Sequence, residues 1–446
     1  MGTLYKEPHH LLQDLKITVK EKCLIFPPKV TKKSMFLSNI DQVLNFNVET
    51  LHFFQSNQDF PPHLVSMKLK KTLEKLLEPY DFLAGRLKMN LETGRFEIDC
   101  NGAGAVFVSG FSECRLEELG DLVYPNPAFG QLIINNSDKE DSPLCIIQVT
   151  SFSCGGFAIG ISTNHATFDG ISFKKFLENI AAVAADKPLA VTPCNDRQLL
   201  AARSPPRITF PHPELLKLNT PPSHQQPDPA AAAVFDLTKE NLDFKIFRLT
   251  SADISDLKEK AKSHPGARVS GFNVVTAHIW RCKALSYDEN EDLERESRIL
   301  YAVNIRPRLK PPLPDSYTGN AVLTAYASAK CKELKEGPVS RLVEMIVAGA
   351  KRMDDEYARS AIDWGEMNKG FPNGEFLVSS WWKLGFEQVV YPWGSPAFSC
   401  PLVYHRKDII LLFPDTVDRE GVNVLVALPP QQMVKFQLLF KNFLLD

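Results

Sequence analysis

The sequence lacks the patterns that mark several large classes of protein. Its nine cysteines form no C-x-x-C pair, its ten histidines form no H-E-x-x-H pattern, and G-x-S-x-G is absent. Zinc or other metal sites, a disulfide framework and a serine nucleophile are therefore unsupported, and we expect buried thiols in a reducing compartment. The 51 basic and 53 acidic residues also provide no concentrated positive charge for binding nucleic acid.

Signals for membranes and export are also lacking. No apolar run approaches the ~18 residues of a membrane span, and no charged segment followed by an apolar core begins the chain, as a signal peptide would. Lys6 stands where a myristoylation signal needs Ser or Thr. We therefore expect a cytosolic protein without a membrane partner, and we expect it to be a monomer.

A proline-rich segment, 195–243, divides the chain. Two domains are expected, because 446 residues exceed one typical hydrophobic core. Proline fixes φ and removes a backbone donor, so the segment predicts an extended crossover and not a packed element. We expect an N-terminal domain over 1–194 and a C-terminal domain over 244–446. The prolines of the segment are Pro205, Pro206, Pro211, Pro213, Pro221, Pro222, Pro227 and Pro229, followed by alanines at 230–233.

Both domains mix strands with amphipathic helices, which indicates the α/β class. Apolar runs and alternation predict strands over 47–54, 104–111, 144–150, 157–162, 300–305, 321–327, 376–381, 409–413 and 422–427. Helical spacing predicts helices over 65–77, 171–185 and 272–285, and one from a Ser251 cap to about residue 263. We expect two α/β halves with a cleft between them.

The stretch H-A-T-F-D-G, residues 165–170, carries the best candidate for catalysis. His165 follows an apolar strand, Gly170 permits a sharp turn into the next helix, and a histidine pKa near 6.5 suits proton transfer at cellular pH. Asp169 could orient the imidazole, as the third member of a triad does. It could equally fold away and brace the turn through an arginine. A purely structural histidine is the alternative.

No nucleophile accompanies His165. Cys154 is near it in sequence, but its place beside an apolar strand favours a core thiol. A lone general base suffices when the substrate is already activated. A thioester is such a substrate, because its thiol leaves with a pKa near ~8.5 and needs no strong acid. This argument points to acyl-CoA as a co-substrate, with no tightly bound cofactor.

Several motifs in order along nearly the whole chain resemble the plant BAHD acyltransferase family, in particular its hydroxycinnamoyl transferases. Besides H-A-T-F-D-G they are L-S-N-I-D-Q at 37–42, L-A-G-R-L at 83–87, Q-V-T-S-F-S-C-G-G at 148–156, F-N-V-V-T-A-H-I-W-R-C at 272–282, N-I-R-P-R-L-K-P-P-L-P at 304–314 and Gly319-Asn320. The resemblance implies two chloramphenicol-acetyltransferase-like domains of mixed sheet and helices, joined by a crossover loop, with the active-site channel between them.

The resemblance also implies roles for individual residues. His165 would deprotonate a small alcohol or amine, while Asp169 points away from the substrate and pairs with Arg306, or failing that with Arg308. Acyl-CoA would enter from one face and the acceptor from the other.

Trp381 would donate its indole N–H to the tetrahedral oxyanion, with burial in the core as the alternative. We further expect Trp382 and Ser38, the serine of L-S-N-I-D-Q, at the substrate, and Ser270 at the phosphates of CoA.

The chain departs from the family at its second hallmark, D-F-G-W-G. Residues 390–394 read V-Y-P-W-G, so Trp393 and Gly394 remain as expected CoA contacts, while Val390 replaces the aspartate. The departure leaves three functions open. They are ordinary acyl transfer to a separate acceptor, a coumarin-synthase-like isomerisation and lactonisation of ortho-hydroxycinnamoyl-CoA, and a non-catalytic accessory role in lipid or wax metabolism.

Overall fold

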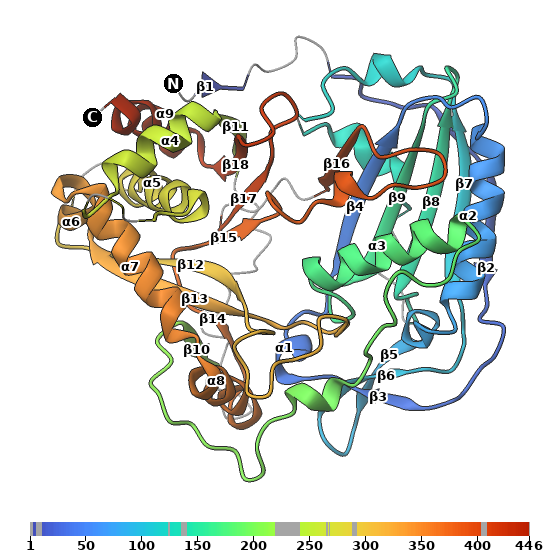
Figure 1. Ribbon diagram of the computed structural model, residues 1–446, viewed down its shortest axis with the longest axis horizontal. Coiled ribbons are helices and arrows are strands. Elements are labelled where there is room, and N and C mark those ends of the chain that lie inside the picture. The colour runs from blue at the N-terminus through green and yellow to red at the C-terminus, as the bar shows by residue number, and fades with distance from the viewer. Residues whose placement is uncertain are drawn as a thin grey trace.

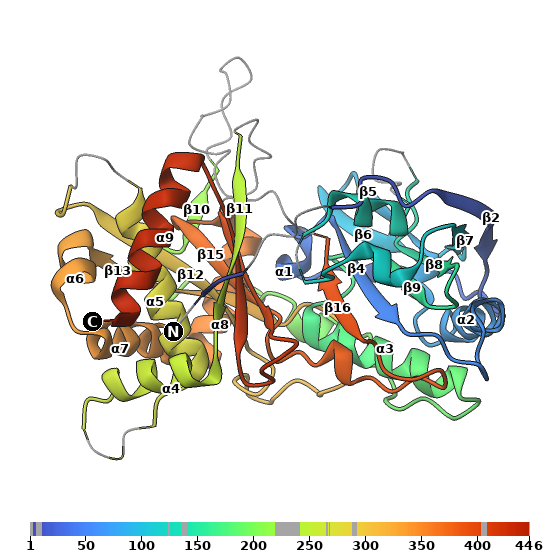
Figure 2. The same cartoon turned by 90° about the horizontal axis from the view of Figure 1, so that it is seen from above.

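The chain folds into two α/β halves that lie side by side (Figures 1 and 2). The computed structural model describes residues 3–5, 11–123, 125–134, 141–218, 241–264, 266, 268–287, 292–402 and 408–445. Each half is built around one large mixed sheet. The α/β class and the pair of halves expected from the sequence are therefore confirmed.

The N-terminal half contains a six-stranded sheet, in which only β7 and β8 run parallel. Its strand order is β16 (Phe398–Pro401), β4 (Asn47–Phe54), β9 (Phe157–Asn164), β8 (Cys145–Phe152), β7 (Ala105–Ser112) and β2 (Ile17–Ile25). Every residue of β9 is buried, which agrees with its continuous apolar run. This half also contains a separate three-stranded sheet, in the order β3 (Ser34–Phe36), β6 (Arg95–Asp99) and β5 (Arg86–Asn90).

Helices α2 (Pro62–Leu76) and α3 (Gly170–Ala184) cover one face of this sheet (Figure 1). Their apolar stripes, such as Val65 and Leu69 on α2 and Phe176 and Leu177 on α3, join one core with Ile159 of the sheet. The remaining short helices of this half are α1 (Asn39–Gln42), η1 (Asp81–Ala84), η2 (Leu116–Leu119) and η3 (Pro127–Leu132).

The C-terminal half contains a seven-stranded sheet. Its order is β1 (Thr3–Leu4), β11 (Asp243–Leu249), β18 (Val422–Leu428), β17 (Ile409–Pro414), β15 (Phe376–Ser380), β12 (Glu296–Asn304) and β13 (Val322–Lys330). Alternate residues of β18 serve two cores, because side chains alternate across a strand. Val424 and Val426 face the helices of this half, whereas Leu425 joins the core shared with the other half.

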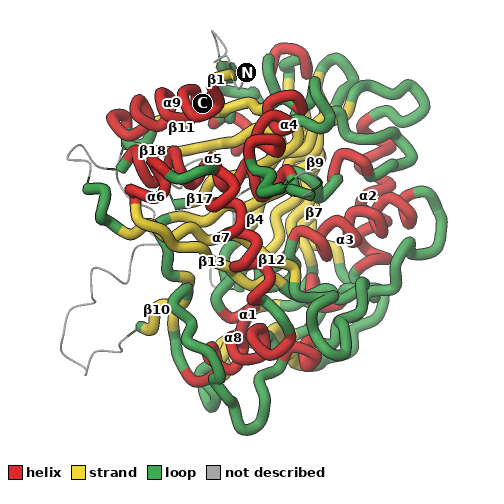
Figure 3. The backbone as a smooth tube through the Cα atoms, turned by 60° about the vertical axis from the view of Figure 1, so that its left-hand side comes forward, coloured by secondary structure: helices red, strands yellow, loops and turns green. Residues whose placement is uncertain are grey.

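Helices pack over the outer face of the C-terminal sheet (Figure 3). They are α4 (Ser251–Lys260), α5 (Gly271–Ser286), α6 (Cys331–Glu336), α7 (Val339–Arg352) and α9 (Pro430–Leu445). Helix α8 (Asp355–Met367) lies apart from them and contacts α1 of the other half. The cap of α4 is Thr250 and not Ser251, since the Thr250 hydroxyl accepts the Asp253 amide at 3.2 Å.

The two sheets exchange edge strands. β1 comes from the start of the chain but pairs with β11 of the C-terminal sheet. β16 comes from the C-terminal part of the sequence but pairs with β4 of the N-terminal sheet. The second exchange is fixed by a side chain as well, because buried His52 on β4 lies 2.8 Å from the Ser399 hydroxyl on β16. The segment 386–401, which includes η6 (Phe386–Gln388), thus belongs spatially to the N-terminal half.

The described part of the proline-rich segment is more packed than its composition predicts. It forms η4 (Arg197–Leu200) and β10 (Leu215–Lys217), which pairs with β14 (Gly370–Pro372). Arg203 donates to Asp363 of α8 at 2.6 Å, and His212 is buried against Ser360 of the same helix. The prediction of an unpacked crossover is therefore wrong for residues 195–218. Pro221, Pro222, Pro227, Pro229 and the four alanines lie outside the described residues.

The cysteines and the search for membrane spans complete the description. All nine cysteines are free thiols, and six of them are buried. Among the described residues, no helix has the length and the apolar character needed to cross a membrane.

We predict that the fold loses stability in mild acid because of two buried histidines. Burial lowers the pKa of His52 and of His278 from 6.5 to about 3, so below pH 6.5 the unfolded chain binds about two more protons than the folded protein. The free energy of unfolding should then fall by roughly 1.4 kcal/mol per pH unit for each histidine. Urea unfolding at pH 7, 6 and 5 measures the slope.

The matched variants are His52→Gln and, as control, His63→Gln, whose side chain is exposed on α2. His52→Gln should reduce the dependence of the unfolding free energy on pH by roughly 1.4 kcal/mol per pH unit, and His63→Gln should leave it unchanged. Equal slopes in both variants would show that His52 does not contribute.

Candidate active site

His165 lies directly after β9, where the chain turns toward α3. Its backbone N–H donates to the carbonyl of Phe46 at 2.7 Å, and its carbonyl accepts the side-chain amide of Asn320 at 2.8 Å. The ring of Phe46 meets the imidazole edge-on at 5.2 Å. Both backbone groups of His165 are thus fixed, one by each half of the protein.

The imidazole of His165 faces a cavity. Its Nδ1 is buried without a hydrogen-bond partner among the described residues, which leaves Nε2 as the ring nitrogen accessible from the cavity. Burial lowers the pKa of His165 below 6.5, while its own backbone carbonyl, the charge of Asp169 and the Asn320 amide oppose that shift. The ring is therefore neutral at pH 7, the state that can accept a proton.

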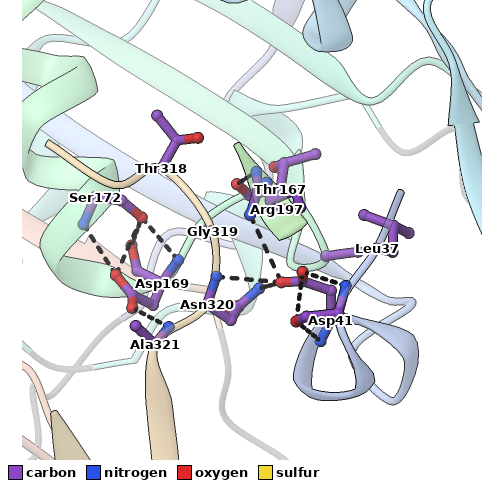
Figure 4. Close-up of polar contacts among 12 residues, drawn as sticks. Leu37, Asp41, Thr167, Asp169, Ser172, Arg197, Thr318, Gly319, Asn320 and Ala321 are labelled. Carbon is purple, nitrogen blue, oxygen red and sulfur yellow. Dashed lines mark hydrogen bonds and ion pairs between the residues drawn. The ribbon is translucent and has the colours of Figure 1, made fainter. Parts of the chain in front are cut away.

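Asp169 does not contact this ring and instead braces the turn. It is the N-cap of α3, where its Oδ1 accepts the Ser172 amide at 2.9 Å (Figure 4). Arg306 binds both carboxylate oxygens, with Nη1 2.7 Å from Oδ2 and Nη2 3.1 Å from Oδ1. The Ala321 amide donates to Oδ2 at 3.0 Å. The carboxylate is fully occupied, so the triad alternative for Asp169 is excluded in this structure.

The Asp169–Arg306 pair is buried, with 4% and 2% of the side chains exposed. Burial by itself would raise the pKa of Asp169, but the charge and hydrogen bonds of Arg306 outweigh it and lower that pKa. Arg308, the second candidate, lies elsewhere and donates to the carbonyl of Met353 at the end of α7. The pairing expected from the sequence is thus present between Asp169 and Arg306.

A second buried network, not foreseen from the sequence, supports the same turn. Asn320 donates through its side chain and its backbone to Oδ1 of Asp41, at 2.8 and 3.1 Å, as Figure 4 shows. Arg197 lies 3.6 Å from the same oxygen and donates to the Thr167 carbonyl at 2.8 Å. Asp41 and Asn320 both lie in recognised motifs, but only the fold shows that they meet.

The cavity at His165 has a volume of about 340 Å³ and is walled by both halves. His165, Phe168 and Gly170 come from the N-terminal half, and Asn304, Ser380 and Trp381 from the C-terminal half. Gly170 allows close packing here, since a Cβ at this position would lie 2.6 Å from Cδ1 of Leu384. The expected cleft between the halves is therefore present, and His165 lies on its wall.

Of the paired tryptophans, only Trp381 lines this cavity. It is partly exposed, and its ring meets Phe386 edge-on at 5.2 Å. Trp382 is buried in the core under α4 and α5, 3.1 Å from where a Cβ on Gly271 would lie. Trp382, expected at the substrate, lies outside this cavity, because the turn at residues 382–384 takes its ring into the core.

Ser38 is another correction. It is fully buried and caps α1, with its hydroxyl 2.7 Å and its backbone N–H 3.0 Å from Oδ2 of Asp41. It therefore orients the carboxylate that binds Asn320 and does not reach the cavity. Ser270 is exposed and caps α5, where its hydroxyl accepts the Asn273 amide at 3.1 Å.

Trp393 and Gly394 lie away from the cavity, in the loop that leads to β16. Trp393 stacks on Tyr391 with ring centroids 5.3 Å apart and meets Phe54 edge-on. Tyr391 and Gly394 form an isolated β-bridge, and φ of Gly394 is 112°, a region that favours glycine. Trp393 thus anchors the exchanged strand through aromatic packing, and the CoA contacts expected of both residues stay predictions.

A second, larger cavity of about 580 Å³ adjoins the first. Both are lined by Leu44, Val322, Thr324 and Pro372. The two cavities are therefore neighbours, and the second lies between α1 and α8.

Comparison with known proteins agrees with this geometry. A sequence model described as the transferase family matches residues 15–442. Acyltransferase GLAUCE of Arabidopsis thaliana is 60% identical over all of this chain and all of its own. The chain belongs to the BAHD acyltransferase family. Within it, omega-hydroxypalmitate O-feruloyl transferase of Arabidopsis thaliana is 32% identical over 95% of this chain and 92% of its own.

Solved acyltransferases share the fold. Vinorine synthase superposes with a TM-score of 0.73 at 24% identity, over 94% of this chain and 96% of its own. TRI101 of F. graminearum, in complex with coenzyme A and deoxynivalenol, gives 0.75 at 16% identity over 91% and 97%. The protein is thus a BAHD acyltransferase with the two-domain fold of the family.

We predict that Asp169→Asn destabilises the protein strongly. The substitution keeps the size of the side chain but leaves Arg306 buried without a counter-charge, which costs about 3–5 kcal/mol of the free energy of unfolding. Urea unfolding followed by circular dichroism measures the loss. Glu344→Gln is the control, because its pair with Arg341 is solvent-exposed, and it should leave stability nearly unchanged. Wild-type stability with lost turnover in Asp169→Asn would instead assign Asp169 to the chemistry.

Proposed function

We propose that the protein transfers a hydroxycinnamoyl group from its CoA thioester to a hydroxyl or amine, with His165 as general base. The observation that carries this proposal is the neutral imidazole of His165, whose accessible nitrogen faces a cavity walled by both halves. A base suffices for this reaction, because a thioester is an activated acyl donor with a good leaving group.

In the proposed reaction, the acceptor O–H or N–H gives its proton to Nε2 of His165 as the acceptor atom attacks the thioester carbonyl. The tetrahedral intermediate carries a negative oxygen, which the indole N–H of Trp381 stabilises. Collapse of the intermediate breaks the C–S bond, and the imidazolium returns the proton to the CoA thiolate. Asp169 and Arg306 keep the turn in place and exchange no proton.

We place the CoA end of the channel on the Trp381 side of the cavity. The N-terminus of α5 lies next to the residue that follows Trp381, since a Cβ on Gly271 would lie 3.1 Å from the ring of Trp382. Exposed N–H groups at the start of a 16-residue helix favour anions, which supports Ser270 as the phosphate contact expected from the sequence. TRI101 has been crystallised with coenzyme A on the same fold.

The relatives support a hydroxycinnamoyl donor and leave the acceptor open. Their names include a fatty alcohol:caffeoyl-CoA acyltransferase, a shikimate O-hydroxycinnamoyltransferase and a putrescine hydroxycinnamoyltransferase, at 32%, 30% and 31% identity. The acyl group in these names is caffeoyl or, more generally, hydroxycinnamoyl. Aliphatic, polar and cationic acceptors all occur.

The second cavity favours ordinary transfer over the coumarin-type reaction. A lactone former carries its own nucleophile and needs no room for an acceptor, whereas here a cavity of about 580 Å³ adjoins the one at His165. The intact arrangement of His165, Asp169 and Arg306 likewise favours an enzyme over an accessory protein.

We predict that His165→Ala lowers kcat by about 10²–10⁴-fold, because the acceptor loses its base, while circular dichroism shows an unchanged fold. In the wild type, kcat/KM should rise with pH along a limb whose midpoint lies below 6.5, since burial lowers the pKa of His165 and only the neutral ring accepts a proton. CoA release from feruloyl-CoA with an acceptor measures both. Unchanged turnover in the variant would remove the base assignment.

The neighbouring tryptophans offer a matched pair of variants. Trp381→Phe keeps an aromatic ring at the cavity but removes the N–H, so kcat should fall by about 10²–10³-fold with little change in KM. Trp382→Phe removes a buried N–H that has no partner among the described residues, and should leave kcat unchanged. Equal effects of the two substitutions would assign Trp381 a packing role only.

A further inference from the structure

The second cavity is bounded by elements from both halves. Its walls come from α1, the β5–β6 hairpin, β14 and α8, and it meets the His165 cavity at Leu44, Val322, Thr324 and Pro372. In Figure 1 these elements lie in the lower half of the view. This second cavity is lined neither by Trp381 nor by the start of α5, which the proposed function assigns to CoA.

The lining of this cavity is mostly apolar. It includes Ile40 and Ile362, which are buried, and Leu323, which is partly buried. Its rim carries three of the exposed large hydrophobic residues of the protein: Val43 at 48%, Met89 at 45% and Met367 at 59% exposed. Exposed apolar side chains that gather at one opening mark a binding site for an apolar partner.

The charged side chains of the lining are mostly occupied by protein partners. Arg95 donates to Glu366 at 2.8 Å and to the Asn39 side chain at 2.7 Å. Glu214 is buried and accepts from the Tyr357 hydroxyl at 2.8 Å. Lys369 is exposed at the surface. Inside the cavity, an anionic or polyhydroxylated acceptor would exchange water for an apolar wall, which is unfavourable.

We propose that the acceptor is a long-chain aliphatic alcohol. Its terminal hydroxyl lies at Nε2 of His165 and its chain fills the second cavity toward Val43 and Met367. The inference rests on the proposed function and names its acceptor. Because each methylene group moved from water to an apolar wall is worth a factor of about three to four, kcat/KM should rise with chain length until the cavity is full.

The test uses the full-length protein with feruloyl-CoA and a series of primary alcohols from butanol to hexadecanol, with shikimate and putrescine as polar acceptors. Free CoA and the ester or amide product are measured. We expect kcat/KM to rise at least 100-fold along the alcohol series and to be low for both polar acceptors. A preference for shikimate or putrescine, or no dependence on chain length, would overturn the inference while the proposed transfer stands.

Two variants localise the effect. Val43→Trp at the rim and Ala361→Phe on α8 should each lower kcat/KM for hexadecanol by at least tenfold and change it for butanol less than threefold. Val434→Trp, at an exposed valine on α9, is the matched control for the first. If Val43→Trp and Ala361→Phe each change kcat/KM for hexadecanol and for butanol by the same factor, the alcohol's hydrocarbon chain does not occupy this cavity.

Failure of the proposed acyl transfer would give a different result from failure of the acceptor assignment. No acceptor of any class would then yield product, or an ortho-hydroxycinnamoyl-CoA would release CoA with no acceptor added. The second outcome would favour lactone formation over transfer.

Discussion

The buried pair of Asp169 and Arg306 is the interaction on which the active site depends. Asp169 begins α3 in the N-terminal half, and Arg306 follows β12 in the C-terminal half. Arg306 also donates to the carbonyls of Tyr317 and Gly319, so one guanidinium holds the loop that carries Asn320. A buried pair adds little net stability compared with apolar packing, but it specifies one alignment of the two halves. Here that alignment places the Asn320 amide on the carbonyl of His165.

The unusual V-Y-P-W-G sequence is compatible with this arrangement. Val390, which replaces the aspartate of the family motif, is 72% exposed and touches neither cavity. The neighbouring Tyr391 and Trp393 are buried against Phe54, and β16 then completes the N-terminal sheet. Aromatic packing and strand exchange thus anchor the loop without a charge, which is why the departure leaves the surroundings of His165 intact.

Local patterns predicted much of this structure. The β9 strand, helix α3 and the turn between them follow from an apolar run, Gly170 and helical spacing, all within about 30 residues. The Asp169–Arg306 contact required the family resemblance. Contacts between distant segments were missed. Asp41 meets Asn320, which lies 279 residues away in sequence, and β16 pairs with the distant strand β4. No local pattern predicts either contact. Of the two neighbouring tryptophans only Trp381 lines the cavity, because the turn at residues 382–384 takes Trp382 into the core.

A crystal structure with an unreactive thioether analogue of feruloyl-CoA and a long-chain alcohol would test the central claim most directly. The account predicts the alcohol oxygen at about 2.6–3.2 Å from Nε2 of His165, with Asp169 still bound to Arg306. It would be contradicted by an alcohol hydroxyl bound away from His165, or by an Asp169 carboxylate that has left Arg306 for Nδ1 of the imidazole.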